Sequence, residues 1–340
     1  MILIRGELNM CDIKSFQPTI IQQLKDFQGN KIFIKREDLL PLSFGGNKVR
    51  IALEYIEDMK SKGYDTLIGY GNTRSNLCRV LSNIACRERI PCYIVSPADD
   101  SGHIVTTNNS LLSQNCNASY IYCQKNNVPS TISNLILDLK NKNKNPYYIN
   151  GNEFGIGNEA IPVNAYYKTF MEICKQEQEA KIKFDYIFVA LGTGMTYSGL
   201  ISGKIASNDH FHNIIGVSIA RNAKQCIEKV ESYTSEFLKT KGINPDKVLL
   251  EKNIHITDDY LFGGYSLYNS EVKNTIKGLY QKEGIYADTT YVGKAYYGMK
   301  KFIEENNIVD KNILFIHTGS APLFFDKIND VFGDENEIYK

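Results

Sequence analysis

Residues 44–50 read Phe-Gly-Gly-Asn-Lys-Val-Arg and stand between a predicted strand at residues 31–35 and a predicted helix. The two glycines let the backbone adopt dihedrals that other residues avoid, and they let a ligand approach closely. Asn47 can cap the helix or donate a side-chain hydrogen bond. A lysine fixed at such a turn, as Lys48 is, can lose its water and become a nucleophile toward a carbonyl group. The same run also fits an ordinary strand-to-helix turn, so other segments must decide.

Strands and helices alternate along the chain around this turn. Short apolar runs predict strands, and apolar residues at helical spacing predict helices between them. The predicted strands are residues 31–35, 66–70, 91–95, 119–122, 147–150, 186–191, 214–219 and 312–317, and the predicted helices include 49–59, 77–84, 104–113, 132–139 and 162–177. This alternation indicates an α/β protein with mainly parallel sheets, in which ligands bind at the carboxyl ends of the strands.

Composition narrows the class of protein. The chain has 340 residues, 43% of them hydrophobic and 23% charged, which suits a soluble protein of about two domains. A net charge of +1 gives no field for nucleic acid or an acidic membrane, and no apolar run is long enough to span a bilayer. The eight cysteines include no C-x-x-C pair, which argues against a metal site and suits a reducing cytoplasm. The first ten residues are expected to form an extension.

A glycine-rich loop follows the predicted strand at residues 186–191. Its first five residues are Gly192, Thr193, Gly194, Met195 and Thr196. Backbone N–H groups at the start of the helix that follows can bind an anion. The loop lacks the Gly-Lys-Ser/Thr of nucleotide-binding P-loops, and no acidic residue on the next strand supports a dinucleotide. A phosphate monoester fits the loop best, and a tight turn without a ligand is the alternative.

Two more strand ends carry polar groups. Residues 71–76 read Gly-Asn-Thr-Arg-Ser-Asn and open the helix after the second predicted strand. Hydroxyl and amide groups at a helix start can receive a carboxylate, although Thr73 or Ser75 can also be a simple helix cap. Residues 317–320 read His-Thr-Gly-Ser and follow the last predicted strand. The Thr318 hydroxyl could meet a ring nitrogen of a ligand there, or the segment could be only a turn.

Tyr265 and Tyr291 are weaker candidates, because a chain with 22 tyrosines uses most of them for packing. Either one becomes an acid–base group only if it faces a cofactor. The whole set comprises a lysine after a glycine turn, a phosphate-type loop, a carboxylate-type helix start and a strand-end hydroxyl. Together these features indicate a pyridoxal phosphate (PLP) enzyme that acts on an amino acid.

The motifs resemble a known family over nearly the whole chain. The run Lys-Arg-Glu-Asp-Leu at 35–39, followed by the turn at 44–50, is similar to the signature K-R-[DE]-D-L…G-G-N-K-x-R. Further matches are Ser75, Asn76 and Arg79 in S-N-x-x-R, and Gly284, Tyr291, residues 293–295 and residues 317–319 in C-terminal blocks. This family is the fold type II PLP enzymes, and the chain resembles their branch of D-cysteine desulfhydrases and 1-aminocyclopropane-1-carboxylate (ACC) deaminases.

For the cofactor, the resemblance implies one role for each candidate residue. Lys48 would carry PLP as a Schiff base and shuttle the Cα proton of the substrate. Asn76 would bind the phenolic oxygen of the cofactor, and the backbone of residues 192–196 would cradle its phosphate. Thr318 would lie near the pyridine nitrogen, where a neutral hydroxyl favours elimination chemistry.

For the substrate, the resemblance implies that Ser75 holds the carboxylate and acts in catalysis. Asn76, Tyr265 and Tyr291 would line the substrate side. Tyr291 would be an acid or a base, or would only pack.

Four departures from the family pattern concern the substrate, together with Thr318, which agrees with the desulfhydrases and differs only from the ACC deaminases. ACC deaminases have glutamate and leucine where this chain has Val292 and Thr318, which argues against ring-opening deamination. Leu77 replaces a histidine or glutamine of the family, and Met195 replaces a glycine of the phosphate loop. Residues 150–157 also depart from the glycine-rich form of the family.

The resemblance implies a tryptophan synthase β-like fold with two open, twisted, mainly parallel sheets flanked by helices. The small domain would be residues 52–160, and the large PLP-binding domain would combine residues 1–51 and 161–340. The protein would be a cytoplasmic homodimer that binds a small amino acid, with no nucleic acid, membrane or metal.

The expected activity is β-elimination from D-cysteine or a related β-substituted alanine, which gives pyruvate and ammonia. One alternative is a β-replacing or deaminating enzyme of the same fold. Another is a non-catalytic binding protein that retains the fold.

Overall fold

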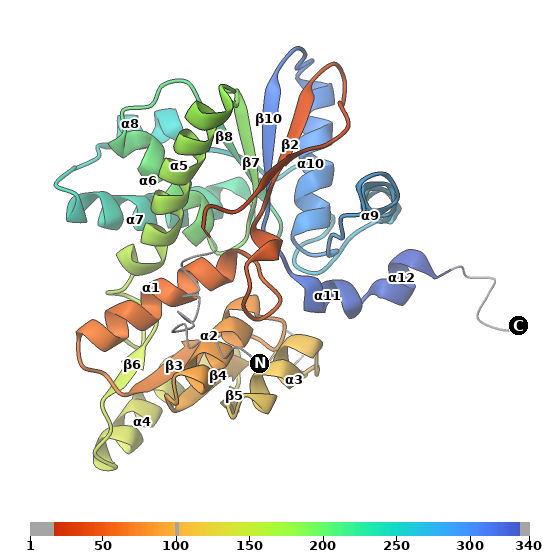
Figure 1. The fold of residues 1–340 in the computed structure, drawn as a ribbon. Coiled ribbons are helices and arrows are strands. Elements are labelled where there is room, and N and C mark those ends of the chain that lie inside the picture. Colours follow the sequence, from red (N-terminus) through yellow and green to blue (C-terminus); the bar gives the residue numbers. More distant parts are fainter. Residues whose placement is uncertain (1–16, 99–101, 334–340) are drawn as a thin grey trace, which may run out of the picture.

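The computed structural model describes residues 17–98 and 102–333 (Figure 1). The extension expected at residues 1–10 lies outside them. The α-helices of the described part are α1 (Asn47–Ser61), α2 (Asn76–Arg87), α3 (Asn108–Asn115), α4 (Val128–Asn141), α5 (Ala160–Ala180), α6 (Met195–Ala206), α7 (Ala223–Thr240), α8 (Lys247–Asn253), α9 (Ser270–Glu283), α10 (Val292–Glu305), α11 (Ala321–Phe325) and α12 (Ile328–Phe332). Two 3₁₀ turns lie at Glu37–Leu39 and Lys125–Asn127.

The larger sheet has six strands in the order β1-β2-β10-β7-β8-β9. These strands are β1 (Ile21–Gln23), β2 (Lys31–Arg36), β7 (Tyr186–Leu191), β8 (Asn213–Ser218), β9 (His255–Thr257) and β10 (Asn312–His317). All neighbours pair in parallel except β1 and β2, which are antiparallel. Every residue of β10 after the first is buried, as expected for a central parallel strand covered on both faces.

Successive residues of β10 enter different cores. Ile313 and Phe315 belong to a cluster that α9 and α10 cover, whereas Leu314 and Ile316 belong to a cluster that includes α5 and α6. This two-residue period follows from strand geometry, because successive side chains point to opposite faces of a sheet. The six-stranded sheet is therefore the central layer of its half of the molecule.

The smaller sheet has four strands in the order β5-β4-β3-β6, all parallel. They are β3 (Thr66–Tyr70), β4 (Cys92–Pro97), β5 (Ser119–Cys123) and β6 (Pro146–Tyr148). The predicted fold class is confirmed, because the chain forms two mainly parallel sheets flanked by helices. The domain division at residues 52–160 stays a prediction, since one core cluster contains residues of both sheets.

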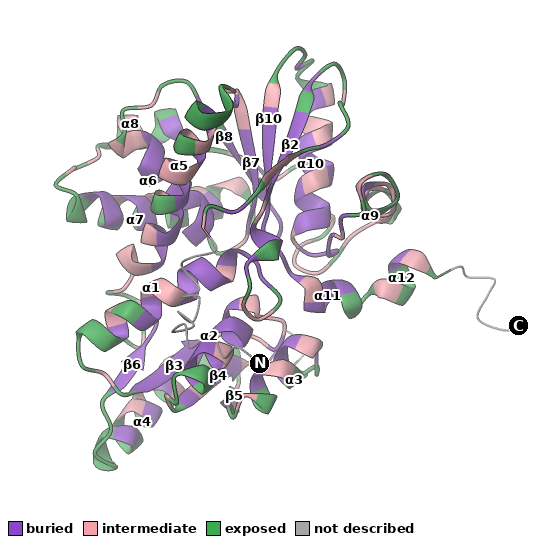
Figure 2. Cartoon of the chain, viewed as in Figure 1, coloured by how far each residue is buried: buried purple, intermediate pink, exposed green. Residues whose placement is uncertain are grey.

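Helix α1 lies between the two halves of the molecule (Figure 1). It packs against α2 on the side of the small sheet and against α5 on the side of the large sheet. Figure 2 shows that the strands are buried along most of their length and that the exposed residues gather on the outer helices and loops. None of the described helices is long and apolar enough to cross a membrane.

All eight predicted strands are present, with small shifts at their ends. The helix predicted at residues 104–113 was wrong at its start, because α3 begins only at Asn108. Thr107 and Ser110 form a capping box there, which ends the extended segment and fixes the start of the helix. The short edge strands β1 and β9 were not predicted, because three residues carry too little periodicity.

Candidate active site

The glycine pair before Lys48 is required by close backbone contacts. Gly45 and Gly46 have φ values of +66° and +99°, which other residues rarely adopt. A Cβ atom at Gly45 would collide with the carbonyl oxygen of Asp38, and one at Gly46 would lie 2.8 Å from the carbonyl oxygen of Thr318. The positive φ values were expected from the two glycines, whereas the contact of this turn with the segment that follows β10 is a finding of the structure.

Lys48 lies in the first turn of α1 and is half-buried. Its Nζ atom makes no hydrogen bond or ion pair with any residue that the structure describes. Burial lowers the pKa of this amine to about 8, because removal of water disfavours the charged form. About a fifth of the amine is therefore neutral at pH 7.4, far more than for an exposed lysine, and the neutral form is the one that attacks a carbonyl carbon.

A buried cluster of charges holds the start of α1 in place. The Arg50 guanidinium binds Glu37 at 2.6 Å and Glu172 of α5 at 2.9 Å, and the Lys35 ammonium binds Glu172 at 2.6 Å. The side chain of Glu37 is fully buried and also accepts a hydrogen bond from Tyr166. Lys35, Glu37 and Arg50 of the signature thus connect β2 and α1 to α5. Because Arg50 is two residues after Lys48, these ion pairs hold the backbone of the lysine turn in place. Motif reasoning found these residues but gave them no role.

Asn47 connects the turn to two other candidate segments. Its backbone N–H donates to the carbonyl oxygen of Thr318 at 3.1 Å, and its side-chain Nδ2 donates to Oγ1 of Thr196 at 2.8 Å. The N-cap of α1 is Gly46, so of the two roles open to Asn47 the structure supports the side-chain donor. Through this one residue, the lysine turn, the glycine-rich loop and the end of β10 lie together.

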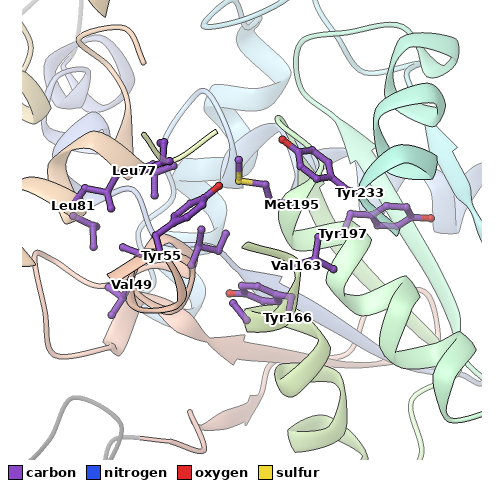
Figure 3. Packing of buried hydrophobic residues seen from close by; sticks show 14 of the residues in the cluster. Val49, Tyr55, Leu77, Leu81, Val163, Tyr166, Met195, Tyr197 and Tyr233 are labelled. Carbon is purple, nitrogen blue, oxygen red and sulfur yellow. The ribbon is translucent and has the colours of Figure 1, made fainter. Parts of the chain in front are cut away.

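The glycine-rich loop leaves the start of α6 open. Gly194 is the N-cap, with a φ of +98°, and no side chain caps the helix. The first N–H groups of a helix have no partner inside the helix, so this terminus can accept an anion. Met195 does not have a positive φ, so this position does not need the glycine that the family has there. Its N–H can therefore donate to an anion at the start of α6. Figure 3 shows its side chain in the core, between Tyr55 and Tyr233.

Ser75 and Asn76 lie at the start of α2. The Ser75 hydroxyl oxygen accepts the N–H of Cys78 at 3.2 Å, so Ser75 is the N-cap of α2. The sequence had left open whether Thr73 or Ser75 caps this helix. Asn76 Nδ2 donates to Oγ of Ser320 at 2.9 Å, and its Oδ1 accepts from Asn109 at 3.1 Å. Asn109 is fully buried on α3 and was missed by sequence reasoning, because nothing in the sequence around it marks a buried amide.

Tyr265 and Tyr291 lie side by side, with 2.9 Å between their hydroxyl oxygens. Burial raises the pKa of both phenols, so both are protonated near neutral pH. A Cβ atom at Gly192 would lie 3.4 Å from Cε1 of Tyr291, so the pair borders the glycine-rich loop. The two candidate tyrosines are therefore one hydrogen-bonded unit beside that loop.

Two buried charges fix the tyrosine pair, and their roles were missed. The Asp288 carboxylate accepts the N–H groups of Thr290, Tyr291 and Val292 at 2.9 to 3.0 Å. The Lys294 ammonium donates to the carbonyl oxygens of Ile219, Leu261 and Gly264, at 3.1, 2.8 and 2.5 Å. Asp288 thus orients the residue before α10, and Lys294 ties the loop that carries Tyr265 to α10.

Thr318 is almost fully buried at the end of β10, and its hydroxyl makes no hydrogen bond within the described part of the chain. His317 beside it donates from Nε2 to the carbonyl oxygen of Tyr286 at 2.7 Å, and its Nδ1 accepts the N–H of Gly319 at 3.2 Å. Burial lowers the pKa of His317, which agrees with this neutral arrangement. The histidine therefore supports the turn and leaves the threonine as the free polar group.

Two of the family departures lie in the cores. Leu77 is 7% exposed and Val292 fully buried, each within a different hydrophobic cluster. The described residues contain no group of three or more His, Cys, Asp or Glu side chains able to hold a metal ion. The polar groups of the site are thus the lysine, the loop amides, Ser75, Asn76, the tyrosine pair and Thr318.

Comparisons with known proteins agree with this geometry. A family model described as "Pyridoxal-phosphate dependent enzyme" matches residues 14–319. D-cysteine desulfhydrases of Serratia proteamaculans (strain 568) and Yersinia pestis (strain Pestoides F) are each 30% identical over 311 residues, which cover 90% of this chain and 91% of each relative.

Solved structures show the same likeness. The crystal structure of an ACC deaminase homologue has a TM-score of 0.78 and 27% identity, and the match covers 92% of both chains. A hydrogen sulfide-producing enzyme from Fusobacterium nucleatum has a TM-score of 0.59 at 21% identity, over 93% of this chain and 97% of that one. The latter likeness supports the fold alone.

Proposed function

Because the chain belongs to the family of pyridoxal-phosphate dependent enzymes, we propose that it is a lyase that removes the β-substituent of a small amino acid. D-cysteine, or a related β-substituted alanine, is the leading substrate. The observation that carries this proposal is the half-buried amine of Lys48, which has no partner among residues 17–98 and 102–333 and stands at a turn linked by hydrogen bonds to the glycine-rich loop and to Thr318. The names of the similar relatives support the substrate.

The residues fit the cofactor at each of its ends. Lys48 has a partly neutral amine for the aldehyde carbon, and the uncapped start of α6 has N–H groups for the phosphate. Asn76 is proposed to bind the phenolic oxygen, and the free hydroxyl of Thr318 the ring nitrogen. When bound, PLP supplies an electron sink for the negative charge that develops on Cα.

Each residue of the site would have a separate role in the reaction. Ser75 and the start of α2 bind the substrate carboxylate, because a helix N-terminus favours an anion. Lys48 would take the Cα proton of the substrate, since an amine with a pKa near the working pH is an efficient base. The bond from Cβ to sulfur would break with sulfur leaving as hydrosulfide, and the protonated phenol of Tyr291 would donate a hydrogen bond to this anion. The remaining fragment takes up water and leaves as pyruvate and ammonia.

The test is a substrate panel with the protein loaded with PLP. We expect pyruvate and sulfide from one enantiomer of cysteine, and visible absorption from the bound cofactor. Lys48→Ala should abolish both, whereas Lys60→Ala, which changes an exposed lysine of the same helix, should leave both intact. Turnover of ACC but not of cysteine would overturn the proposed elimination.

The same substrate panel distinguishes this elimination from two alternative functions. A β-replacing enzyme would release sulfide only when a second nucleophile is added, and it would form a new amino acid in place of pyruvate. A non-catalytic protein would turn over no amino acid and take up no PLP. The unpartnered Lys48 and the open loop favour an enzyme, because a binding relic has no need of either.

We further propose a cytoplasmic homodimer whose small domain is residues 52–160. The family resemblance supports both features. Light scattering on the purified protein should give a mass of about twice that of one chain, and a monomer would contradict the dimer. Limited proteolysis that releases a stable fragment near residues 52–160 would support the domain division.

A further inference from the structure

Arg79 of α2 is a buried cation whose partners are all neutral. The residue is 1% exposed. Its guanidinium donates from Nε to Oδ1 of Asn109 at 2.8 Å, from Nη1 to Oγ of Ser43 at 2.8 Å and from Nη2 to Oδ1 of Asn76 at 3.3 Å. It forms no ion pair with any residue of the described ranges, whereas Arg50 binds two carboxylates. Burial lowers the pKa of Arg79 to about 10. The site thus contains a positive charge that no described carboxylate neutralises.

The guanidinium of Arg79 fixes the orientation of two asparagine amides. Because arginine has N–H donors and no acceptor, an amide that bonds to it must present its oxygen. Asn76 and Asn109 therefore both turn Oδ1 toward Arg79. The Nδ2 atom of Asn109 then donates to Oδ1 of Asn76 at 3.1 Å and to the carbonyl oxygen of Arg74 at 2.9 Å. The Asn76 oxygen thus accepts two hydrogen bonds, and its amide cannot turn over without losing both.

The fixed amide of Asn76 presents its Nδ2 atom to the end of β10. One hydrogen of Nδ2 goes to Oγ of Ser320 at 2.9 Å, two residues after Thr318. An amide nitrogen has two hydrogens, and the second has no acceptor among the residues described. An ionised phenolic oxygen is a strong acceptor for such a hydrogen. Hydrogen bonds in a chain polarise one another, so an amide whose oxygen accepts from a cation is a better donor. The charge of Arg79 can therefore act through Asn76.

We propose that Arg79 and Asn109 are positioning residues for the cofactor. They hold the Asn76 amide with its NH₂ group toward the phenolic oxygen of PLP, and the charge of Arg79 stabilises the ionised form of that oxygen through the amide. This inference rests on the proposed function, because it takes Asn76 as the ligand of the phenolic oxygen. Tyr286 supplies no counter-charge to Arg79, because burial raises the pKa of its phenol.

Asn109→Asp separates this role from packing. The variant keeps the shape of the side chain, gives Arg79 a carboxylate partner and removes the donor to Asn76. The free energy of unfolding without PLP should change little, because the new ion pair offsets the lost hydrogen bonds. The affinity for PLP should fall about tenfold, the effect of one hydrogen bond to a charged group. A PLP analogue that lacks the phenolic oxygen should bind wild type and variant equally. Fluorescence titration without substrate measures both affinities.

The absorption spectrum of bound PLP is the second measurement. The visible band requires an ionised phenolic oxygen, so its share of the absorption should fall in Asn109→Asp and move to the near ultraviolet. Arg79→Gln removes the charge but keeps an N–H donor, and it should give the same change. Arg79→Lys keeps the charge and should restore part of the affinity and of the visible band. The control is Asn115→Asp, which adds the same charge at an exposed position of α3 and should behave as wild type.

The outcomes separate this inference from the proposed function, because no substrate takes part. A loss of affinity that is equal for PLP and for the analogue would overturn the inference, since Arg79 and Asn109 would then only support the fold. So would an Asn109→Asp protein with the affinity and spectrum of wild type, even if wild type releases pyruvate from cysteine. An effect confined to the phenolic oxygen, in a protein that turns over no amino acid, would support the inference and overturn elimination.

Discussion

Lys48 and Lys294 lie in the first turns of two helices, and burial lowers the pKa of each to about 8. Their surroundings differ completely. Lys294 donates to three backbone carbonyl oxygens, whereas Lys48 donates to none of the residues described. A lowered pKa is therefore not enough to identify a reactive lysine. The partners decide, because an amine whose three hydrogens are engaged is held in place, while an amine without partners is free to form a bond.

The largest expected difference between the two lysines is in their reaction with PLP. Borohydride reduction of the protein incubated with PLP should attach the cofactor to Lys48 and leave Lys294 unmodified, as peptide mass spectrometry would show. Lys48→Met should lower turnover by at least about 10³-fold, since it removes the proposed base together with the cofactor attachment. If the adduct forms on Lys294, the partner-based distinction is wrong.

The second difference is in stability. Lys294→Met leaves one buried and two partly buried carbonyl oxygens without this donor, so we expect it to lower the free energy of unfolding by about 3 kcal/mol. Lys48→Met removes an amine that stabilises nothing in the cofactor-free protein and should leave that free energy unchanged or slightly higher. Urea unfolding of the two variants without PLP measures both values. A larger loss for Lys48→Met would contradict this assignment.

The third difference is in pH dependence. The pKa of Lys48 is lowered to about 8 in the folded protein from the 10.5 of an exposed lysine, so the unfolded chain binds more protons between these pH values. The free energy of unfolding therefore gains from Lys48 as the pH rises from 8 to 10, by up to about 1.4 kcal/mol per pH unit. Lys48→Met should lack this gain. The difference between the unfolding curves of wild type and variant isolates it, and a pH-independent difference would contradict a lowered pKa.

Much of the fold and part of the site could be predicted from the sequence. The alternation of apolar runs predicted the strands of both sheets except the short edge strands β1 and β9, because buried parallel strands are continuously apolar. The glycines before Lys48 marked positive φ values correctly, since side chains are excluded there. The role of Asn109 could not be predicted, because its side-chain partner Asn76 is far away in the sequence. The role of Asp288 could not be predicted either, because its partners are backbone N–H groups, which no residue type reveals.

The prediction with the smallest expected effect concerns whether Asn47 holds Lys48 in position. Asn47→Ala removes the hydrogen bond to Thr196 and should lower the free energy of unfolding by about 1 kcal/mol. Asn269→Ala removes the cap of α9 and should lower it by about the same amount. Only Asn47→Ala should also lower kcat/KM, by about tenfold, because misplacing a reacting group by a fraction of an ångström weakens catalysis. If both variants lose activity equally, activity follows overall stability, and the anchoring of the lysine turn through Asn47 has no separate role.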